Sequence, residues 1–537
     1  MKIKDYLNSW YALGALGAVL MCLPWSLGFS PVSLVAWLPW LYMLRGMSRR
    51  GSYWLQFARL LLPMYLWNAL TVWWISGATV AGMLGAILAM GSMMAGVLTI
   101  VLWGWRMRGQ TFALLLLTCI WVWYDYFFHN SEIAWSWLSM GNAWAAMPSL
   151  VQWYEYTGVL GGSLWVMLSG VLLFGLVSGV RGRPRRQTVV LGGLLLLLWV
   201  VPPVLSRAVA GEAQQLAEEN PVEVVIIQPN IDPWKEKFNS LSAMEQVELM
   251  VRMADSLVTP QTRLVLCPET AIAEALWEEE MGDNPFVNHI RAFLAKHPGV
   301  VWVTGATTFR AYPNGVGRTA TARPMERLEG WYYDAYNSAL RIDTSQRVGR
   351  YIKSKLVVGT EMTPYPEHMQ WLNHLSIDLG GIAGSLGTQP YREVFSLPSG
   401  LRFAPIICYE SVFGEYCHDF IRAGADFLTV ITNDAWWGDT PGFREHFSFS
   451  QLRCVETRRW MARCGNTGIS AIINPLGEVV ESTGWWQRRG LRGVVYPLEG
   501  ETFYVRHGDF IGRIVSWMTV LLLAYLGVQT VVRRRHL

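Results

Sequence analysis

Long uncharged apolar runs fill the chain between residues 8 and 207 and return near its C-terminus. A helix needs about 20 apolar residues to cross a bilayer, so each run of this kind is a predicted span. The stretch between the last two runs has the mixed composition of an ordinary globular domain. We therefore predict a transmembrane domain of seven helices at 1–210, a globular domain at 211–510, and a helix with a basic tail at 511–537. The eight predicted spans lie near 8–26, 30–45, 54–75, 78–103, 111–128, 163–180, 187–207 and 513–532.

Basic residues gather in alternate connections between these spans. The other connections, near Gly28, near Gly77 and from 125 to 162, carry almost no Lys or Arg. The positive-inside rule puts the basic connections in the cytoplasm, and a globular domain entered after seven spans is then expected outside it. The basic clusters are Lys2 and Lys4; Arg45, Arg49 and Arg50; Arg106 and Arg108; Arg181, Arg183, Arg185 and Arg186; and Arg533, Arg534 and Arg535.

Within the globular domain, short β-rich apolar runs alternate with amphipathic helical patterns. Some runs, such as 427–431, are apolar throughout, which is typical of strands buried on both faces. Helices should cover such sheets, so we expect a layered α/β or α+β domain. Strands are predicted at 222–227, 264–267, 300–304, 337–342, 403–408, 427–433, 469–473 and 493–496. Helices are predicted at 243–257, 271–280, 286–297, 414–423 and 447–462.

Composition narrows the class of protein. Apolar residues make up 52% of the 537 residues and charged residues only 16%, a balance typical of membrane proteins. A net charge of +4 is too small to indicate a nucleic-acid partner. The seven cysteines show no C-x-x-C spacing, so neither a zinc site nor a disulfide framework is expected. Burial as free thiols is the preferred reading, with pairing of Cys417 and Cys454 or Cys464 left open.

Three chemically complementary residues follow predicted strands: Cys408, Glu269 and Lys353. Strand ends that meet at one edge commonly form an active site. A thiol becomes a strong nucleophile when a base takes its proton and a positive charge lowers its pKa. Glu269 fits the base, and Lys353 fits both the positive charge and the group that stabilises an oxyanion. The sequence thus predicts a Cys–Glu–Lys site.

Each of these residues also has an ordinary structural interpretation. Cys408 could serve packing alone, and Glu269 could be a favourable acid at the start of a helix over 271–280. Lys353 could be a solvated member of a basic strip formed with Arg347, Arg350 and Lys355.

Five short motifs resemble those of the carbon–nitrogen hydrolase (nitrilase) superfamily. Together with the membrane helices on both sides, they make the chain similar to the bacterial apolipoprotein N-acyltransferases. The resemblance implies eight transmembrane helices in the cell inner membrane and a nitrilase-like αββα sandwich facing the periplasm. The motifs are, in order, Pro268-Glu269; Tyr351-Ile352-Lys353; Gly359-Thr360-Glu361; Cys408-Tyr409-Glu410-Ser411; and Thr432-Asn433-Asp434-Ala435-Trp436-Trp437-Gly438.

The resemblance implies an acyltransferase that works without cofactor or metal. It would move an acyl chain from a phospholipid, through a thioester on Cys408, to the α-amino group of a diacylglyceryl-cysteine lipoprotein. Glu269 would be the general base and Lys353 the oxyanion stabiliser. The partners implied are the phospholipid donor, the lipoprotein acceptor and the bilayer, with a monomeric enzyme. Supporting or substrate-binding roles would fall to Glu361, Tyr409, Glu410 and Trp234, the last near the point of lipid access.

Two alternatives remain open. One comes from a departure from the family motif, and the other from an amidase that would use the same catalytic residues. The run 355–361 lacks a histidine and a Pro-Phe pair that are common in the family, and this leaves Lys355 as a rival to Lys353. A membrane-tethered amidase of the nitrilase type would use the same three residues on a small amide, with water as acceptor. Such a small polar substrate gives no reason for eight spans. Apolar segments around Trp436-Trp437 and Trp371-Leu372 are expected to keep water from a thioester.

Overall fold

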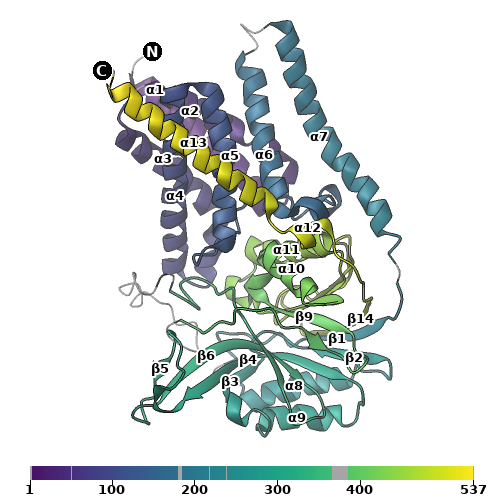
Figure 1. The fold of residues 1–537 in the computed structure, drawn as a ribbon. Helices are drawn as coiled ribbons and strands as arrows, with labels where there is room; N and C mark the ends of the chain where they lie inside the picture. Colours follow the sequence, from purple (N-terminus) through teal and green to yellow (C-terminus); the bar gives the residue numbers. More distant parts are fainter. Residues whose placement is uncertain are drawn as a thin grey trace. The chain divides into compact units, whose positions relative to one another are not determined.

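The computed structural model describes residues 3–49, 51–179, 184–216, 218–237, 239–363, 365 and 385–535. The chain forms two compact units (Figure 1). We call Met1–Ser131, Trp135–Gly211 and His507–Leu537 the helical unit, and Glu132–Ala134 with Glu212–Arg506 the sandwich unit. Trp371, Leu372, Lys2, Arg50, Arg181 and Arg183, which the sequence singled out, lie outside the described residues.

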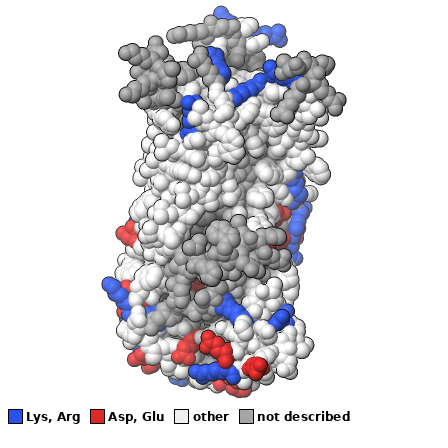
Figure 2. Space-filling view, turned by 90° about the vertical axis from the view of Figure 1, so that its left-hand side faces the viewer, with Lys and Arg blue, Asp and Glu red and all other residues white. Residues whose placement is uncertain are grey.

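The helical unit contains five helices that are long and apolar enough to span a bilayer: α4, α5, α6, α7 and Phe510–Arg533 of α13. Multiple helices of this kind make the chain a membrane protein. On the face shown in Figure 2, charged side chains are sparse over a broad area of this unit. The helices are α1 (Ile3–Ser26), α2 (Trp37–Met47), α3 (Tyr53–Val72), α4 (Val80–Arg108), α5 (Gln110–Asn130), α6 (Tyr154–Gly179), α7 (Arg185–Ala213) and α13 (Phe510–Arg535).

The first three predicted spans differ from this pattern. The stretch predicted at 30–45 is a 3-10 turn, Ser30–Leu34, which contains Pro31, followed by α2. With 11 residues, α2 is about 17 Å long at about 1.5 Å per residue, too short to cross about 30 Å of hydrocarbon. α1 contributes a shorter apolar stretch, Trp10–Ser26. Five of the eight predicted spans are therefore present by length and apolar composition within the described residues.

Tryptophan rings form the centre of the helical unit. Trp37, Trp40, Trp67 and Trp121 are almost fully buried, and neighbouring pairs meet edge to face or tilted with ring centroids 4.6–6.3 Å apart. A methyl group on Gly17 would lie 2.0 Å from the Trp40 ring, so glycine is required for α1 and α2 to approach this closely.

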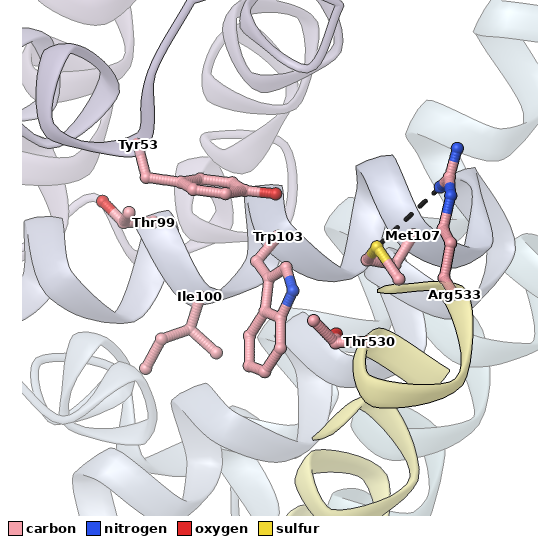
Figure 3. A pocket seen from close by; sticks show the side chains of 7 residues that line it. All are labelled: Tyr53, Thr99, Ile100, Trp103, Met107, Thr530 and Arg533. Atoms are coloured by element: carbon pink, nitrogen blue, oxygen red, sulfur yellow. Dashed lines mark hydrogen bonds between the residues drawn. The ribbon is translucent and has the colours of Figure 1, made fainter. Parts of the chain in front are cut away.

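A cavity of about 610 Å³ also lies within the helical unit (Figure 3). Tyr53 of α3, Trp103 and Met107 of α4, and Arg533 of α13 contribute to its lining. None of the predicted active-site residues lines it, so it is separate from the chemistry that the sequence indicates.

The sandwich unit is built on two sheets. The first has the order β14-β1-β2-β4-β6-β5, with β3 paired to β4 and β7 to β6, and the second has the order β13-β12-β11-β10-β9-β8. Strands of the first sheet are β1 (Val222–Gln228), β2 (Thr262–Leu266), β3 (Ile272–Trp277), β4 (Val301–Tyr312), β5 (Arg323–Pro324), β6 (Tyr332–Ile342), β7 (Gly349–Ile352) and β14 (Arg489–Val495). Strands of the second are β8 (Phe395–Ser396), β9 (Arg402–Ile407), β10 (Phe427–Thr432), β11 (Met461–Gly465), β12 (Ala471–Ile473) and β13 (Val479–Ser482).

The two sheets face each other and helices cover their outer sides. Cys464 Sγ of β11 donates to Ile227 O of β1 at 3.2 Å, which brings the central strands of both sheets into contact. The amphipathic helices α8 (Ala243–Asp255) and α9 (Pro285–Leu294) bury their apolar faces on the first sheet. α10 (Gly414–Arg422) and α11 (Pro441–Thr457) accompany the second sheet (Figure 1). The predicted nitrilase-like α/β sandwich is confirmed.

Two predicted helices are wrong in part. The stretch 271–280 forms β3 and a 3-10 turn, because Ile272 and Leu276 are buried where β3 pairs with the long strand β4. This pairing outweighs the helix propensity of its Ala and Glu residues. The helix predicted over 447–462 ends at Thr457, where Arg458 takes a left-handed φ of 49° and turns the chain into β11.

Candidate active site

Four polar or reactive residues follow strands of the sandwich unit. Glu269 comes after β2, Lys353 directly after β7, Cys408 directly after β9 and Asn433 directly after β10. β9 and β10 are parallel neighbours, so their carboxyl ends lie at the same edge of the second sheet.

Lys353 is at the centre of the site. Its Nζ lies 2.9 Å from Glu269 Oε1 and 2.8 Å from Glu361 Oε1, and the side chain is only 1% exposed. The backbone N–H of Lys353 donates to Asn337 O at 2.8 Å, which fixes the chain where β7 ends. The lysine therefore carries an ion pair to each of the two carboxylates that the sequence singled out.

The charges in this cluster stabilise one another. Burial alone would raise the pKa of Glu269, but the Lys353 ammonium and hydrogen bonds from Lys353, Asn337 and Cys408 outweigh it and lower the pKa. Burial alone would lower the pKa of Lys353, yet the negative charges of Glu269 and Glu361 raise it well above its usual range. Near neutral pH, Glu269 is therefore an ionised acceptor and Lys353 a cation.

Cys408 faces the same cluster. Its thiol lies close enough to Glu269 and Lys353 for their charges to act on it, and its backbone has a φ of 47°, which is uncommon for a residue other than glycine. Burial first, and then the charge of Glu269, raise the pKa of the thiol well above its usual value, and Lys353 offsets this only in part. Lys353 therefore lowers the pKa of the thiol, as expected of a nearby cation, but burial and Glu269 have the larger effect. The thiol keeps its proton until a base accepts it.

Two asparagines complete the site, and the sequence analysis assigned neither a role. Asn337 Nδ2 donates to Glu269 Oε1 at 2.8 Å and to Glu361 Oε1 at 3.0 Å. The backbone N–H of Asn433 donates to the other oxygen of Glu269, Oε2, at 3.1 Å. An amide side chain at the start of the predicted strand 337–342 was the available signal for Asn337. Asn433 stood in a quoted motif without a stated function.

Tyr409 and Glu410 lie in the 3-10 turn that follows Cys408 (Cys408–Val412). Glu410 is fully buried and accepts four hydrogen bonds, from the backbone N–H groups of Ser354 and Ile407 and from the hydroxyls of Tyr351 and Tyr416, at 2.5–2.9 Å. It thus ties the chain after Lys353 to the turn at Cys408. The Tyr409 hydroxyl donates to Ala134 O at 2.7 Å.

The other two predicted residues lie outside the charged cluster. Trp234 is 49% exposed, and its ring meets the edge of Trp436 with centroids 5.0 Å apart. Lys355, the rival lysine, places Nζ 4.8 Å from the centre of the Phe413 ring. The geometry therefore favours Lys353 over Lys355 as the partner of Glu269.

The cysteine expectations are settled by the same coordinates. All seven cysteines are free and buried, so a disulfide between Cys417 and Cys454 or Cys464 is wrong. Among the described residues there is also no group of three or more His, Cys, Asp or Glu side chains placed to hold a metal ion.

Comparison with known proteins identifies both parts of the chain. Residues 223–495 match the carbon–nitrogen hydrolase family, and residues 17–172 match the apolipoprotein N-acyltransferase N-terminal domain. The apolipoprotein N-acyltransferase of Chlorobaculum tepidum is 30% identical over 492 residues, which cover 90% of this chain and 89% of that protein. That of Geobacter metallireducens is 27% identical and covers 95% of this chain and 93% of its own.

A solved structure, Saccharomyces cerevisiae Nit3 of the nitrilase superfamily, has 14% identity and a TM-score of 0.36, with 52% of this chain and 92% of that chain covered. The relatives and the two family matches extend over the helical part and the sandwich part alike. The chain belongs to the apolipoprotein N-acyltransferase family, with a carbon–nitrogen hydrolase domain.

Proposed function

We propose that this apolipoprotein N-acyltransferase moves an acyl chain from a phospholipid to the α-amino group of a diacylglyceryl-cysteine lipoprotein, through a thioester on Cys408. The observation that carries the proposal is the buried cluster in which Lys353 pairs with both Glu269 and Glu361, beside a Cys408 thiol whose pKa the charges of Glu269 and Lys353 shift. A nucleophile, a base and an electrostatic stabiliser at one site are what acyl transfer through a covalent intermediate requires.

In the first half-reaction, Glu269 takes the thiol proton as Cys408 Sγ attacks the ester carbonyl carbon. An ammonium has three N–H donors, and two of those on Lys353 are directed at carboxylates. The third can be directed at the oxyanion, and losing such a donor typically costs about 10²–10³ in rate. The tetrahedral intermediate then expels the lysophospholipid alkoxide, which receives the proton from Glu269. A thioester remains on Cys408.

In the second half-reaction, the neutral α-amine of the lipoprotein attacks the thioester carbon. Glu269, again ionised, takes a proton from the attacking nitrogen, and the C–S bond breaks. The thiolate regains its proton from Glu269, which restores the resting enzyme. The amide product is more stable than the thioester, so this step runs downhill.

Glu361 has a separate task in this scheme. Each time Glu269 holds a proton, it no longer balances the charge of Lys353. A buried charge without a partner is strongly destabilising, by about 3–5 kcal/mol. The ion pair at 2.8 Å to Glu361 keeps Lys353 neutralised throughout the cycle. Glu269 can therefore carry a proton while Glu361 still balances the charge of Lys353.

The membrane arrangement supports the same substrate class, because a phospholipid remains in the bilayer and the five apolar helices hold the enzyme there. We further propose eight spans in the inner membrane, with the basic clusters in the cytoplasm and the catalytic domain on the periplasmic side. In this scheme the membrane domain covers 1–210, the catalytic domain 211–510, and the last span and tail 511–537. The working form is proposed to be a monomer.

Mass spectrometry tests the proposal. Purified full-length protein incubated with phospholipid and no acceptor should gain a fatty acyl mass on the tryptic peptide 403–422, and hydroxylamine should remove it. That peptide also contains Cys417, so fragment spectra must place the adduct on Cys408. Cys408→Ala should abolish the adduct, whereas Cys417→Ser should retain it. Ready hydrolysis of a small amide with no acyl adduct would favour the tethered amidase instead.

A further inference from the structure

A chain of buried polar groups lies behind Cys408 and is unused in the mechanism above. Asp434, His446 and Arg463 are each fully buried, and they come from the turn after β10, from α11 and from β11. Arg463 Nη2 donates to Asp434 Oδ2 at 2.7 Å, and His446 Nδ1 lies 2.8 Å from Asp434 Oδ1. Arg463 Nη2 also lies 3.2 Å from His446 Nδ1.

The other end of this chain reaches the backbone of the nucleophile. His446 Nε2 lies 3.1 Å from Cys408 O and 3.1 Å from Ser411 Oγ, and Ser411 Oγ donates to the same carbonyl at 2.8 Å. The left-handed φ of Cys408 is strained for a residue with a side chain and persists only where the surroundings hold it. The carbonyl contacts of His446 and Ser411 are such a restraint, because they fix the peptide plane that follows the nucleophile.

Asp434 and the Cys408 turn hold the histidine ring from both sides. Burial opposes ionisation of Asp434, but the charge of Arg463 and the contacts with His446 outweigh it and lower the pKa of its carboxyl group. Nδ1 of His446 lies against this carboxylate, and Nε2 lies against Cys408 O and Ser411 Oγ. Contacts at both ring nitrogens fix the orientation of the ring.

The same short segment after β10 also holds the base. Asn433 N–H donates to Glu269 Oε2, and the next residue, Asp434, restrains Cys408 through His446. Two consecutive residues thus reach the base and, through His446, the nucleophile.

We propose that the Arg463–Asp434–His446 chain is a positioning device, which holds the Cys408 turn in its left-handed conformation and so sets the thiol against Glu269. His446 and Asp434 are positioning residues in this view, since they act through the backbone of Cys408 and contact no reacting atom. The proposal rests on Cys408 being the nucleophile of the proposed function.

The test measures single-turnover acylation of Cys408 by phospholipid in full-length protein. A displacement of about 1 Å at a reacting group can cost about 10²-fold in rate. We expect His446→Ala to lower the acylation rate by about 10²-fold and His446→Gln by about 10-fold, because the amide can still donate to Cys408 O. The phospholipid concentration for half-maximal rate should not change, since the ring is fully buried.

A matched control separates positioning from general stability. Gln451 lies on the same helix, and its Nε2 donates to Gly477 O at 2.7 Å. Gln451→Met removes one hydrogen bond to a backbone carbonyl away from Cys408 and should leave the acylation rate within threefold of wild type. A His446→Gln rate within threefold of wild type, or a loss explained by a lowered unfolding temperature alone, would overturn the proposal.

Two further measurements test the positioning role independently of acyl transfer by the His446 variants. If the His446 variants do not fold, Ser411→Ala removes the second contact to the Cys408 carbonyl and should slow acylation by about threefold to tenfold; an unchanged rate would refute the proposal. The rate of Cys408 alkylation by iodoacetamide reports thiol placement without acyl transfer and should fall with His446→Ala. If Cys408→Ala still transfers acyl chains, the proposed function fails, whereas the alkylation result still judges the positioning role.

Discussion

Asn337 and Lys353 donate hydrogen bonds to the same two carboxylate oxygens. Asn337 Nδ2 lies 2.8 Å from Glu269 Oε1 and 3.0 Å from Glu361 Oε1, and Lys353 Nζ lies 2.9 Å and 2.8 Å from these atoms. Two shared donors hold the carboxylates at a fixed separation despite their like charges. The other oxygen of Glu269, Oε2, accepts from the backbone N–H of Asn433 at 3.1 Å.

Asn337 should therefore be sensitive to charge as well as to loss of its amide. Asn337→Asp places a third carboxylate against two others, so Glu269 should bind a proton and the acylation rate should fall more than 10²-fold. Asn337→Ala removes one donor and should cost about tenfold. Single-turnover acylation measures both, and an Asn337→Asp rate within threefold of wild type would contradict the arrangement.

Replacing lysine by methionine should have very different effects on the acylation rate at 353 and at 355. Lys353→Met leaves two buried carboxylates without their cation and removes the oxyanion donor, so the rate should fall by at least about 10²–10³. The unfolding temperature should fall as well. Lys355→Met makes the same change of charge two residues away, where Nζ lies 4.8 Å from the centre of the Phe413 ring. Its rate should stay within threefold of wild type, and the reverse order would make Lys355 the catalytic lysine.

The lowered pKa of Glu269 predicts how stability depends on pH. A carboxyl group whose pKa is lower in the folded state stabilises the fold above its unfolded pKa, near 4.5, and this contribution is lost as pH falls through the folded pKa. Lys353 has a raised pKa, so its contribution is complete below about 10.5 and does not change in this window. The unfolding temperature of wild type should therefore fall below pH 4.5.

The variant Glu269→Gln isolates this contribution. It should show a smaller decline in unfolding temperature between pH 5 and 3 than wild type. Glu248 forms an exposed ion pair with Arg252, so Glu248→Gln should follow the wild-type curve. An equally steep decline for Glu269→Gln would show that the carboxyl group is not stabilised as an anion in the fold.

Trp234 is predicted to act on lipid access rather than on chemistry or folding. Half of its side chain is exposed, and its ordered contact is the edge of Trp436. Trp234→Ala should raise the phospholipid concentration for half-maximal rate about fivefold and leave the maximal rate and unfolding temperature unchanged. Tyr391 is a similarly exposed aromatic residue in the same unit, and Tyr391→Ala should change none of the three. Equal effects of the two substitutions would refute a specific role for Trp234.

The sequence was informative where one strand and one reactive side chain meet. Cys408, Glu269 and Lys353 each follow an apolar run, and motifs can be read there without knowledge of tertiary contacts. Asn337 and His446 act across elements that are far apart in sequence, and a single polar residue in a strand or a helix gives no local sign of its partner. Their contributions are seen only in the folded structure, where β6 and α11 lie beside the strand ends.

Secondary structure was predicted least well where tertiary pairing opposes local preference. β3 contains Ala and Glu residues that favour a helix, but its Ile272 and Leu276 are buried beside β4. The helix predicted at 447–462 extends into the start of β11, because the end of the helix depends on one left-handed residue, Arg458. The span predicted at 30–45 is longer than the part of it that is helical in α2, because apolar composition does not reveal the turn before α2.

The most direct test of the account follows one acyl chain. Wild-type enzyme is mixed with phospholipid labelled in the acyl chain, quenched in time, and then supplied with a diacylglyceryl-cysteine peptide. We predict a burst of label on Cys408 that is stoichiometric with enzyme, labile to hydroxylamine, and transferred on addition of the peptide to an amide at its N-terminus. Transfer of label to the peptide with no enzyme-bound label at any time, or equal transfer by Cys408→Ala, would contradict a thioester route.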